Sequence, residues 1–436
     1  MGLKRTLNLL DATSVGVGAI IGAGIFVVLG VAIGYAGPAV IMSIIIAGVV
    51  GSFTAFSFAE LGSAIPKEGG AYAYAYDMIS PSVGFIVGCL WIFAQIVAGA
   101  AISLGFASYF VAIFPMFSIK IVAVLAASAL TALNLIGIKQ STAFNNVLVI
   151  IKVAVLSLFI GFGIFYFHPQ NFSQFSPNGL FGILQGAGFI FFAYLGFGRI
   201  AALGEEVKNP ERILPLSILI ALTISVAIYV LTGFAATGLQ DYRILAQSAS
   251  PLAEAAKTTG NFTLVAAVSL GALIATTSVL LTNLLGLSRV AFAMARNKQL
   301  PKSIAKVSSK FGTPYISIVT TGALLTVLAF VLDLKQAAAI TSFSLLCVHL
   351  TVNVSAINLR KRKAYAPKFQ VPLYPLIPSL GLVSCIILMF SLPQESWIVA
   401  AAVVIASAAM YLLLTRKTEQ FQDSDARIER ADILKT

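Results

Sequence analysis

Residues 16–26 read GVGAIIGAGIF, an uncharged run with four glycines inside the first long apolar segment of the chain. A glycine in a helix interior costs about 1 kcal/mol relative to alanine, so this spacing predicts a helix interrupted around Gly22-Ala23-Gly24. The amides that open the second half of a broken helix suit a carboxylate, and the carbonyls that close the first half suit an ammonium group. Within a membrane, bare backbone is tolerated where it lines a cavity, so this stretch is a candidate binding site for a molecule with both charges, as in an amino acid.

The composition is that of a membrane protein. Of the 436 residues, 59% are hydrophobic and 10% are charged, whereas an average soluble domain has about 25% charged residues. Apolar stretches of about 20 residues are long enough to cross a bilayer as helices. Twelve such stretches stand out, with boundaries good to a few residues: 11–34, 38–65, 83–111, 119–138, 144–167, 179–203, 213–237, 262–293, 315–332, 337–359, 375–393 and 396–415.

The basic residues indicate an orientation. An even number of spans places both chain ends on one side, and short cytoplasmic loops are rich in Lys and Arg. Apart from Lys152 and Arg199, which lie within spans, the basic residues fall on the side of the chain ends with few exceptions. The exceptions are Lys120, Arg243, Lys257 and Lys335. We therefore expect a multi-pass protein of the cytoplasmic membrane with both termini in the cytoplasm, and we interpret the net charge of +12 as an orientation signal, not as a nucleic-acid surface.

A second interruption falls in span six, where residues 191–199 (FFAYLGFGR) contain two glycines. If spans one to five and six to ten are repeats, each half begins with an interrupted helix, which is the pattern of inverted-repeat transporters. Because five is odd, the second half enters the membrane from the opposite side. The predicted organisation is a cytoplasmic N-terminus (1–10), a first repeat (11–167), a second repeat (179–359), two further spans (375–415) and a cytoplasmic tail (416–436).

Lys152 is a charge close to the membrane midplane. It lies about eight residues, or about 12 Å, into span five, within a hydrocarbon core about 30 Å thick. A lysine at this depth costs about 2.5–3.5 kcal/mol and usually faces the bundle interior with a partner. The alternative is that its side chain extends along the helix to the cytoplasmic interface.

The other polar groups at depth leave two interpretations each. Arg199 precedes Glu205 and Glu206 by two helical turns, so extension to the interface or pairing with one of these carboxylates competes with a role inside the bundle. Residues 276–278 (TTS) place three hydroxyls in span eight. They either bond to carbonyls one turn back or form an ion site with a midplane lysine. Glu60, at the end of span two, is expected to have a structural partner.

Catalytic and metal sites find no support in the sequence. Cys89, Cys347 and Cys385 all lie in apolar spans, which gives neither a disulfide framework nor a metal-ligand spacing. His168 and His349 are not near a serine or cysteine motif, so a hydrolytic triad is not supported. We expect no catalytic residue, no metal and no cofactor. The first segment is too long and too rich in glycine for a cleaved signal peptide.

Several motifs, in order along the chain, resemble the amino acid-polyamine-organocation (APC) superfamily. They are similar to bacterial and archaeal permeases of its cationic-amino-acid-transporter-like branch, which includes proton-coupled archaeal members with a lysine in span five. The resemblance implies an all-α integral membrane protein with twelve transmembrane helices, a leucine-transporter-type 5+5 inverted repeat with broken helices one and six, and two C-terminal helices. The matching stretches are 18–26, 59–72, 191–215, 288–301 and 310–315.

The resemblance also implies a substrate site at the two broken helices. In that site, backbone amides after the first break meet the substrate carboxylate, backbone carbonyls of both helices meet its ammonium group, and a phenylalanine ring closes over it. At matching positions the amides are those of Ala23, Gly24 and Ile25. The carbonyls are those of Ile20, Phe192 and Leu195, and the ring is that of Phe192.

A coupling site is implied in the same way. Lys152 would stand where related sodium-coupled transporters bind sodium, so that a proton replaces the metal ion. Its implied contacts are the Gly18 carbonyl and the hydroxyl of Thr277 or Ser278. Burial disfavours the charged form of a lysine, which suits a group that gains and loses a proton during transport.

Two departures from the family pattern bear on specificity. Members that take cationic substrates often carry Asp or Glu at the position of Gly198, and many carry Glu at the position of Gln95. Both acids are missing here. A cationic substrate side chain would be buried without a partner, which is strongly penalised, so neutral side chains are favoured.

We therefore expect a secondary active transporter that imports neutral L-amino acids with protons by alternating access. The nearest alternative is an amino acid exchanger in which Lys152 stays protonated as a fixed replacement for the cation. A membrane sensor of amino acids or a lipid-modifying enzyme is a more distant alternative, because such an enzyme needs clustered acidic or histidine side chains and the acids here are scattered. The expected partners are the amino acid and the lipid bilayer, with the protein a monomer or a weak homo-oligomer.

Overall fold

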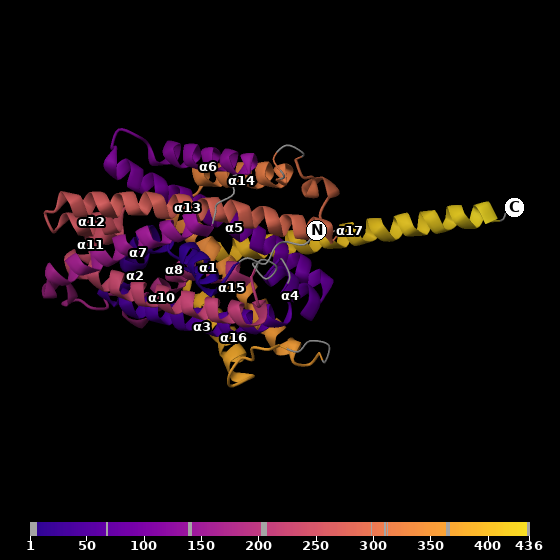
Figure 1. Ribbon diagram of the computed structural model, residues 1–436, viewed down its shortest axis with the longest axis horizontal. Coiled ribbons are helices and arrows are strands. Elements are labelled where there is room, and N and C mark those ends of the chain that lie inside the picture. Colours follow the sequence, from indigo (N-terminus) through magenta and orange to yellow (C-terminus); the bar gives the residue numbers. More distant parts are fainter. Residues whose placement is uncertain are drawn as a thin grey trace.

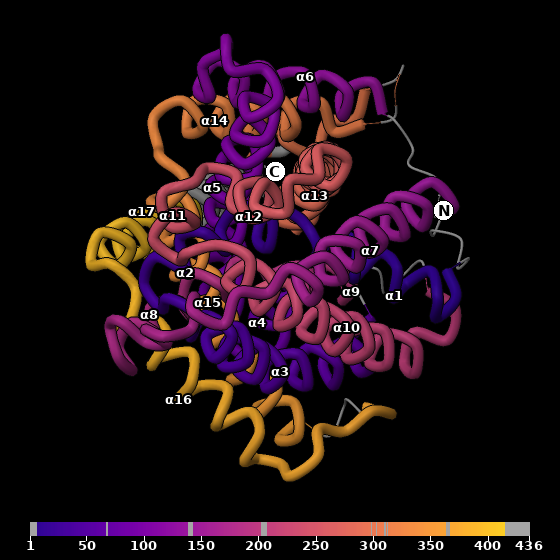
Figure 2. Tube along the Cα trace, turned by 90° about the vertical axis from the view of Figure 1, so that its left-hand side faces the viewer, coloured from indigo at the N-terminus to yellow at the C-terminus, as the bar shows by residue number. Residues whose placement is uncertain are grey.

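The computed structural model describes residues 7–66, 69–137, 142–201, 207–297, 299–308, 311, 313–362 and 367–433, with side chains as far as residue 414 except at positions 142 and 302. Within these ranges the regular elements are helices, as the sequence predicts. Figure 1 shows the long helices running side by side along the long axis of the molecule. Seen along that axis, α6 and α14 lie together at one edge of the bundle and α16 lies at the opposite edge (Figure 2).

Each apolar stretch marked in the sequence coincides with helical structure. Span one comprises α1 (Leu9–Ile20), the π-helix η1 (Gly24–Val28) and α2 (Leu29–Ala36), and span six comprises α8 (Gly179–Tyr194) and α9 (Phe197–Ala201). The remaining stretches form α3 (Val40–Ala64), α5 (Pro81–Ile113), α6 (Ile119–Ile136), α7 (Thr142–Phe165), α10 (Pro210–Leu239), α13 (Phe262–Arg296), α14 (Tyr315–Val331), α15 (Leu334–Leu359), α16 (Leu376–Ser391) and α17 (Gln394–Ile433).

The helices are of the kind that crosses membranes. In the described chain nine helical stretches are long and apolar enough to do so, and the first of them runs from Leu9 to Ala64. Gly37 turns the chain within that stretch, because its φ of 63° is a conformation that glycine adopts without steric cost. α14 and α16 are apolar but shorter. A helical multi-pass membrane protein is thus confirmed, while the count of twelve crossings, the inverted repeat and the domain boundaries stay predictions.

The sequence prediction misses short helices in the connections. α4 (Ala71–Met78) follows α3, and α11 (Tyr242–Gln247) and α12 (Pro251–Lys257) lie between α10 and α13. They have six to eight residues, which is too short for a helical period of apolar residues to show in the sequence. The helix α17 also continues to Ile433, beyond its predicted end near residue 415 (Figure 1).

Polar side chains fix where two of the apolar helices begin. At α1, Asn8 Oδ1 accepts a hydrogen bond from the Asp11 amide at 3.0 Å, and Asp11 Oδ2 accepts one from the Asn8 amide at 3.2 Å. Asp333 and Gln336 form the same reciprocal pair at the start of α15. Each pair satisfies amides that have no partner within the helix, a contribution of about 1 kcal/mol.

Both ends of the described chain lie at one end of the bundle. The start of α1 and the C-terminal part of α17 are at this end, which we call the terminal face (Figure 1). The short helices α11 and α12 lie at the other end, which we call the opposite face (Figure 1). The common location of the two chain ends agrees with the sequence prediction.

A buried ion pair ties α3 to the segment after α15 near the terminal face. The Glu60 side chain is fully buried, and its Oε1 accepts a hydrogen bond from Arg360 Nε at 2.8 Å. Its Oε2 accepts a hydrogen bond from the Val371 amide at 3.0 Å. Arg360 also donates to the Val371 carbonyl at 3.0 Å and lies 4.1 Å from the centre of the Tyr374 ring. Both oxygens of the carboxylate are therefore satisfied, and Glu60 has the structural partner that the sequence predicts.

Loss of Arg360 should leave the Glu60 carboxylate buried without its counter-ion. We expect Arg360→Ala to lower the free energy of unfolding by about 3–5 kcal/mol at most, since 26% of the Arg360 side chain is exposed. Glu254→Ala, which breaks an exposed pair with Lys257, should cost less than about 1 kcal/mol. Thermal unfolding of the purified variants in detergent measures both effects, and equal melting temperatures would contradict the assignment.

Candidate functional site

The first interruption lies where the sequence predicts it. α1 ends at Ile20, and the next residue, Ile21, has an extended backbone with ψ of 99°. Helical hydrogen bonding then resumes in a π-helix that begins at Gly24. Single turns of π-helix often occur at functional sites, because they leave backbone groups outside the regular ladder.

The second interruption also matches its prediction. α8 ends at Tyr194, and α9 begins at Phe197, so Leu195 and Gly196 form a two-residue break. α9 then continues toward Arg199 and Ala201. Two helices that are each broken near the middle of an apolar segment therefore provide backbone groups inside the bundle.

The two breaks touch each other through glycine. A Cβ added to Gly24 would lie 2.3 Å from the Ala193 Cα, and a Cβ added to Gly196 would lie 2.4 Å from the Ala19 carbonyl carbon and the Ile20 nitrogen. Real Cβ contacts are essentially never this short, so a side chain at either glycine would push the helices apart. The contact thus requires glycine in both broken helices. It brings the interrupted regions of the two helices together.

Tyr229, on α10, joins the two breaks and was not singled out by the sequence analysis. Its buried hydroxyl lies 2.7 Å from the Ile20 carbonyl oxygen and 3.3 Å from the Ala193 carbonyl oxygen, so its single proton is shared between the two acceptors and the shorter bond is to Ile20. The resemblance assigns the Ile20 carbonyl to the substrate ammonium group. In this structure that carbonyl already accepts a hydrogen bond from Tyr229. A lone tyrosine in the middle of an apolar span was the available signal, because a buried hydroxyl needs a partner.

A second tyrosine closes the first break on the side of the opposite face. The Tyr109 hydroxyl, on α5, donates to the Phe26 carbonyl at 2.6 Å and accepts a hydrogen bond from the Leu252 amide at 3.3 Å. The rings of Phe26 and Tyr109 pack edge to face with centroids 6.2 Å apart. The helix α12 therefore rests on the far end of η1, and it covers the break from that side.

A small cavity of about 30 Å³ lies between the breaks. A cavity needs about 10–15 Å³ to hold one water, so this one has room for water and is too small for an amino acid. Five of the six residues predicted to hold the substrate line it, namely Ile20, Ala23, Gly24, Phe192 and Leu195. The sixth, Ile25, is fully buried and is not part of this lining.

Lys152 contacts the first broken helix. Its side chain is 1% exposed, and its Nζ donates a hydrogen bond to the Gly18 carbonyl at 2.8 Å. The side chain therefore points into the bundle and does not extend along α7 to an interface. Gly18 permits this approach of α7, because a Cβ there would lie 2.7 Å from a Val149 methyl group.

The hydroxyls of span eight do not join this contact. Thr276 Oγ1 donates to the Ala272 carbonyl at 2.7 Å, and Ser278 Oγ donates to the Ala275 carbonyl at 3.1 Å. These are bonds to the preceding turn, which was the local alternative for the three hydroxyls. Among the described residues, Lys152 donates its hydrogen bond to the Gly18 carbonyl. The implied bridge from Lys152 to Thr277 or Ser278 is therefore not present in this state.

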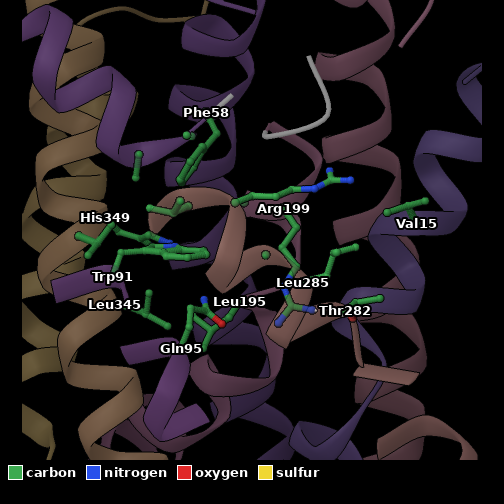
Figure 3. A pocket seen from close by; sticks show the side chains of 18 residues that line it. Val15, Phe58, Trp91, Gln95, Leu195, Arg199, Thr282, Leu285, Leu345 and His349 are labelled. Carbon is green, nitrogen blue, oxygen red and sulfur yellow. Dashed lines mark hydrogen bonds between the residues drawn. The ribbon is translucent and has the colours of Figure 1, made fainter. Parts of the chain in front are cut away.

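A larger cavity of about 140 Å³ adjoins the breaks on the side of the terminal face. Figure 3 shows side chains that converge on it from several helices. Gln95, Leu195 and Arg199 line both this cavity and the small one, so the two are neighbours. The other labelled side chains in Figure 3 are Val15, Phe58, Trp91, Thr282, Leu285, Leu345 and His349.

Arg199 lies between the two cavities. Its Nη1 donates a hydrogen bond to Thr282 Oγ1 on α13 at 3.0 Å. The carboxylates proposed as its alternative partners, Glu205 and Glu206, are outside the described residues. Since Arg199 also lines the small cavity, it borders the residues that are predicted to hold the substrate.

The positions expected to carry acids in transporters of cationic substrates hold neutral groups here. Asn283 Nδ2 donates to the Gln95 backbone oxygen at 3.2 Å and to its Oε1 at 3.3 Å. A Cβ added at Gly198 would meet the Phe58 ring at 3.5 Å. Among the described residues, no Asp or Glu lines either cavity, and no group of three His, Cys, Asp or Glu side chains is placed to hold a metal.

Comparison with known proteins agrees with this architecture. A family model described as "Amino acid permease" matches residues 11–414. The methylthioribose transporter of Bacillus subtilis (strain 168) is 34% identical over 95% of this chain and 94% of its own length. The branched-chain amino acid permease of the same organism is 31% identical over 95% of this chain and 94% of its own. The vacuolar cationic amino acid transporter 4 of Arabidopsis thaliana is 33% identical over 85% of this chain and 65% of its own.

The close crossing of the breaks makes a specific prediction about Gly24. Gly24→Ala should lower the melting temperature and abolish the stabilisation that substrate gives, since its methyl group would overlap Ala193. Gly161→Ala is the control, because nothing lies within 4 Å of a Cβ at that helical position and alanine is the better helix former. Thermal unfolding with and without amino acid measures both variants. A Gly24→Ala protein that unfolds and binds like the wild type would disprove this location of the site.

Proposed function

Because the chain belongs to the amino acid permease family of the APC superfamily, we propose that it imports small or medium neutral L-amino acids together with protons by alternating access. The observation that carries the proposal is the meeting of two broken helices beside a buried lysine. The breaks offer amides and carbonyls to the two charged groups of an amino acid. Lys152 is hydrogen-bonded to the first of these helices and supplies a group that can take up and release a proton.

The lining of the two cavities supports a neutral substrate side chain. Its described residues are mostly apolar, and its charged members, Arg199 and Arg289, are cations. A cationic substrate side chain would meet no carboxylate among them, and a buried charge without a partner is strongly unfavourable. The relatives' names differ in substrate, with branched-chain amino acids, cationic amino acids and methylthioribose among them, so the lining carries the argument for specificity.

The proposed coupling works through the contact of Lys152 with Gly18. With a proton, Lys152 holds α7 against α1, and in our proposal it also reaches Thr277 or Ser278 when the site faces outward. After the proton leaves to the cytoplasm, the hold on α1 weakens and the inner path opens. One charge moved through about 100 mV is worth roughly 2.3 kcal/mol, or about a 50-fold concentration ratio.

The terminal face is the cytoplasmic face in this proposal. The basic residues of the loops and tails on that side support the orientation under the positive-inside rule. The protein would then reside in the cytoplasmic membrane with both termini inside the cell. The nearest alternative, an exchanger with a permanently protonated Lys152, differs in having no net uptake driven by protons.

Substrate preference should follow the lining of the cavities. We expect L-alanine, L-serine and L-leucine to raise the melting temperature of the purified protein and to outcompete L-arginine and L-lysine in uptake by proteoliposomes. A thermal-shift screen of the twenty amino acids with methylthioribose added measures binding, and competition measures transport. Preference for arginine or lysine would show that an unidentified carboxylate serves the pocket. Stabilisation by methylthioribose alone would replace the amino acid proposal.

Loss of Lys152 should uncouple transport from protons. Lys152→Ala removes the titrating group but leaves the backbone of both breaks, so the variant should bind and exchange amino acid without accumulating it. Uptake by the wild type should rise as the outer pH falls below the inner pH, whereas uptake by the variant should stay flat. Lys257→Ala, at an exposed lysine of the opposite face, should behave like the wild type. Accumulation by Lys152→Ala under a proton gradient alone would rule out Lys152 as the coupling residue.

A further inference from the structure

The cavity on the terminal side of the breaks is lined by positive charge. Among its described lining residues the charged side chains are Arg199 and Arg289. Arg289 already interacts with another residue. Arg199 faces the cavity in company with Thr282, which Figure 3 shows beside it. The electrostatic character of this space therefore favours an anionic group.

Most N–H donors of the Arg199 guanidinium have no hydrogen-bond partner among the described residues. A guanidinium carries five N–H donors in a fixed fork, and in the described chain Arg199 uses one, toward Thr282 Oγ1. Removing a charge from water is costly unless it is paired, so an arginine with this many open donors is poised for an anionic partner. Space for a partner exists nearby, because a Cβ added at Gly286 would meet only Trp91, at 3.9 Å.

The position of Arg199 places it on the exit path. It lines the small cavity at the breaks and the larger cavity toward the terminal face, as do Gln95 and Leu195. It follows the Gly196 break by three residues, or about 4.5 Å of helical rise. A molecule that moves from the small cavity to the larger one therefore crosses a boundary that Arg199 shares with Gln95 and Leu195.

We propose that Arg199, oriented by Thr282, forms a second carboxylate subsite that receives the α-carboxylate of the amino acid as it leaves the breaks toward the terminal face. The inference rests on the proposed function, since it needs an amino acid in the site at the breaks. Arginine suits this task because its planar fork can bind a carboxylate through two parallel hydrogen bonds. The carboxylate passes from the amides of the first broken helix to this fork, so that it is not left unpaired between the two cavities.

The same chemistry has a second possible source in the side-chain carboxylate of aspartate or glutamate. In that case Arg199 would select acidic substrates at the breaks instead of receiving every substrate on its way out. The two sources differ in which substrates and which side of the membrane are affected. We favour the α-carboxylate because Arg199 lines the larger cavity as well as the small one.

The test compares the Michaelis constant on the two faces of the membrane. In proteoliposomes with one orientation, Arg199→Gln should raise the KM for L-leucine supplied at the terminal face by about tenfold or more, as expected for loss of a charge-assisted hydrogen bond. The KM at the opposite face should change less than about twofold. Arg199→Lys keeps the charge but loses the fork, so it should fall between. Arg289→Gln removes an equal charge from the same cavity and is the control for general electrostatic attraction.

The possible outcomes separate the two proposals. Equal KM changes on both faces, or equal effects of Arg199→Gln and Arg289→Gln, would overturn the subsite. Uptake of L-glutamate by the wild type that Arg199→Gln abolishes would assign Arg199 to acidic side chains. A variant that only loses thermal stability, with both KM values unchanged, would give Arg199 a structural role. If the wild type neither binds nor transports any amino acid, the proposed function fails before the subsite is reached.

Discussion

The contact between the two broken helices is the constraint on which the rest of the structure depends. Gly24 lies against Ala193 and Gly196 lies against the backbone of Ala19 and Ile20, at distances that leave no room for a side chain. Two interrupted helices in a membrane are costly, because backbone groups at the breaks lack partners and cannot turn to water. Tyr229 offsets part of that cost by donating to carbonyls on both sides of the crossing.

The sequence predicts the backbone of this site better than its side-chain contacts. Glycine spacing locates both interruptions, because a glycine inside an apolar helix needs a reason that is visible without a structure. Lys152 could be predicted to face the bundle interior for a similar reason, since a buried charge is expensive and needs a partner. The hydrogen-bond partners of the buried hydroxyls were harder to predict. Thr276 and Ser278 donate to carbonyls of their own helix, whereas Tyr229 reaches carbonyls on two other helices.

The difference follows from the range of the interactions. A helix break or a membrane span is decided by neighbours in the chain, so composition and spacing suffice. The direction of a hydroxyl is decided by which helices pack together, and an apolar segment with no polar face carries little information about that. The short helices α4, α11 and α12 escape prediction for a related reason, because packing on longer helices stabilises them more than their own sequence does.

The Glu60–Arg360 pair restricts how the molecule can change shape. Its carboxylate is fully buried and is held by both a guanidinium and the Val371 amide. Any motion that separated α3 from Arg360 and Val371 would leave a negative charge without a partner in an apolar interior, which is strongly unfavourable. α3 and these two residues are therefore expected to move as one rigid unit, and in the proposed alternating access the bending would fall on other elements, with the unwound residues of the broken helices as the candidates.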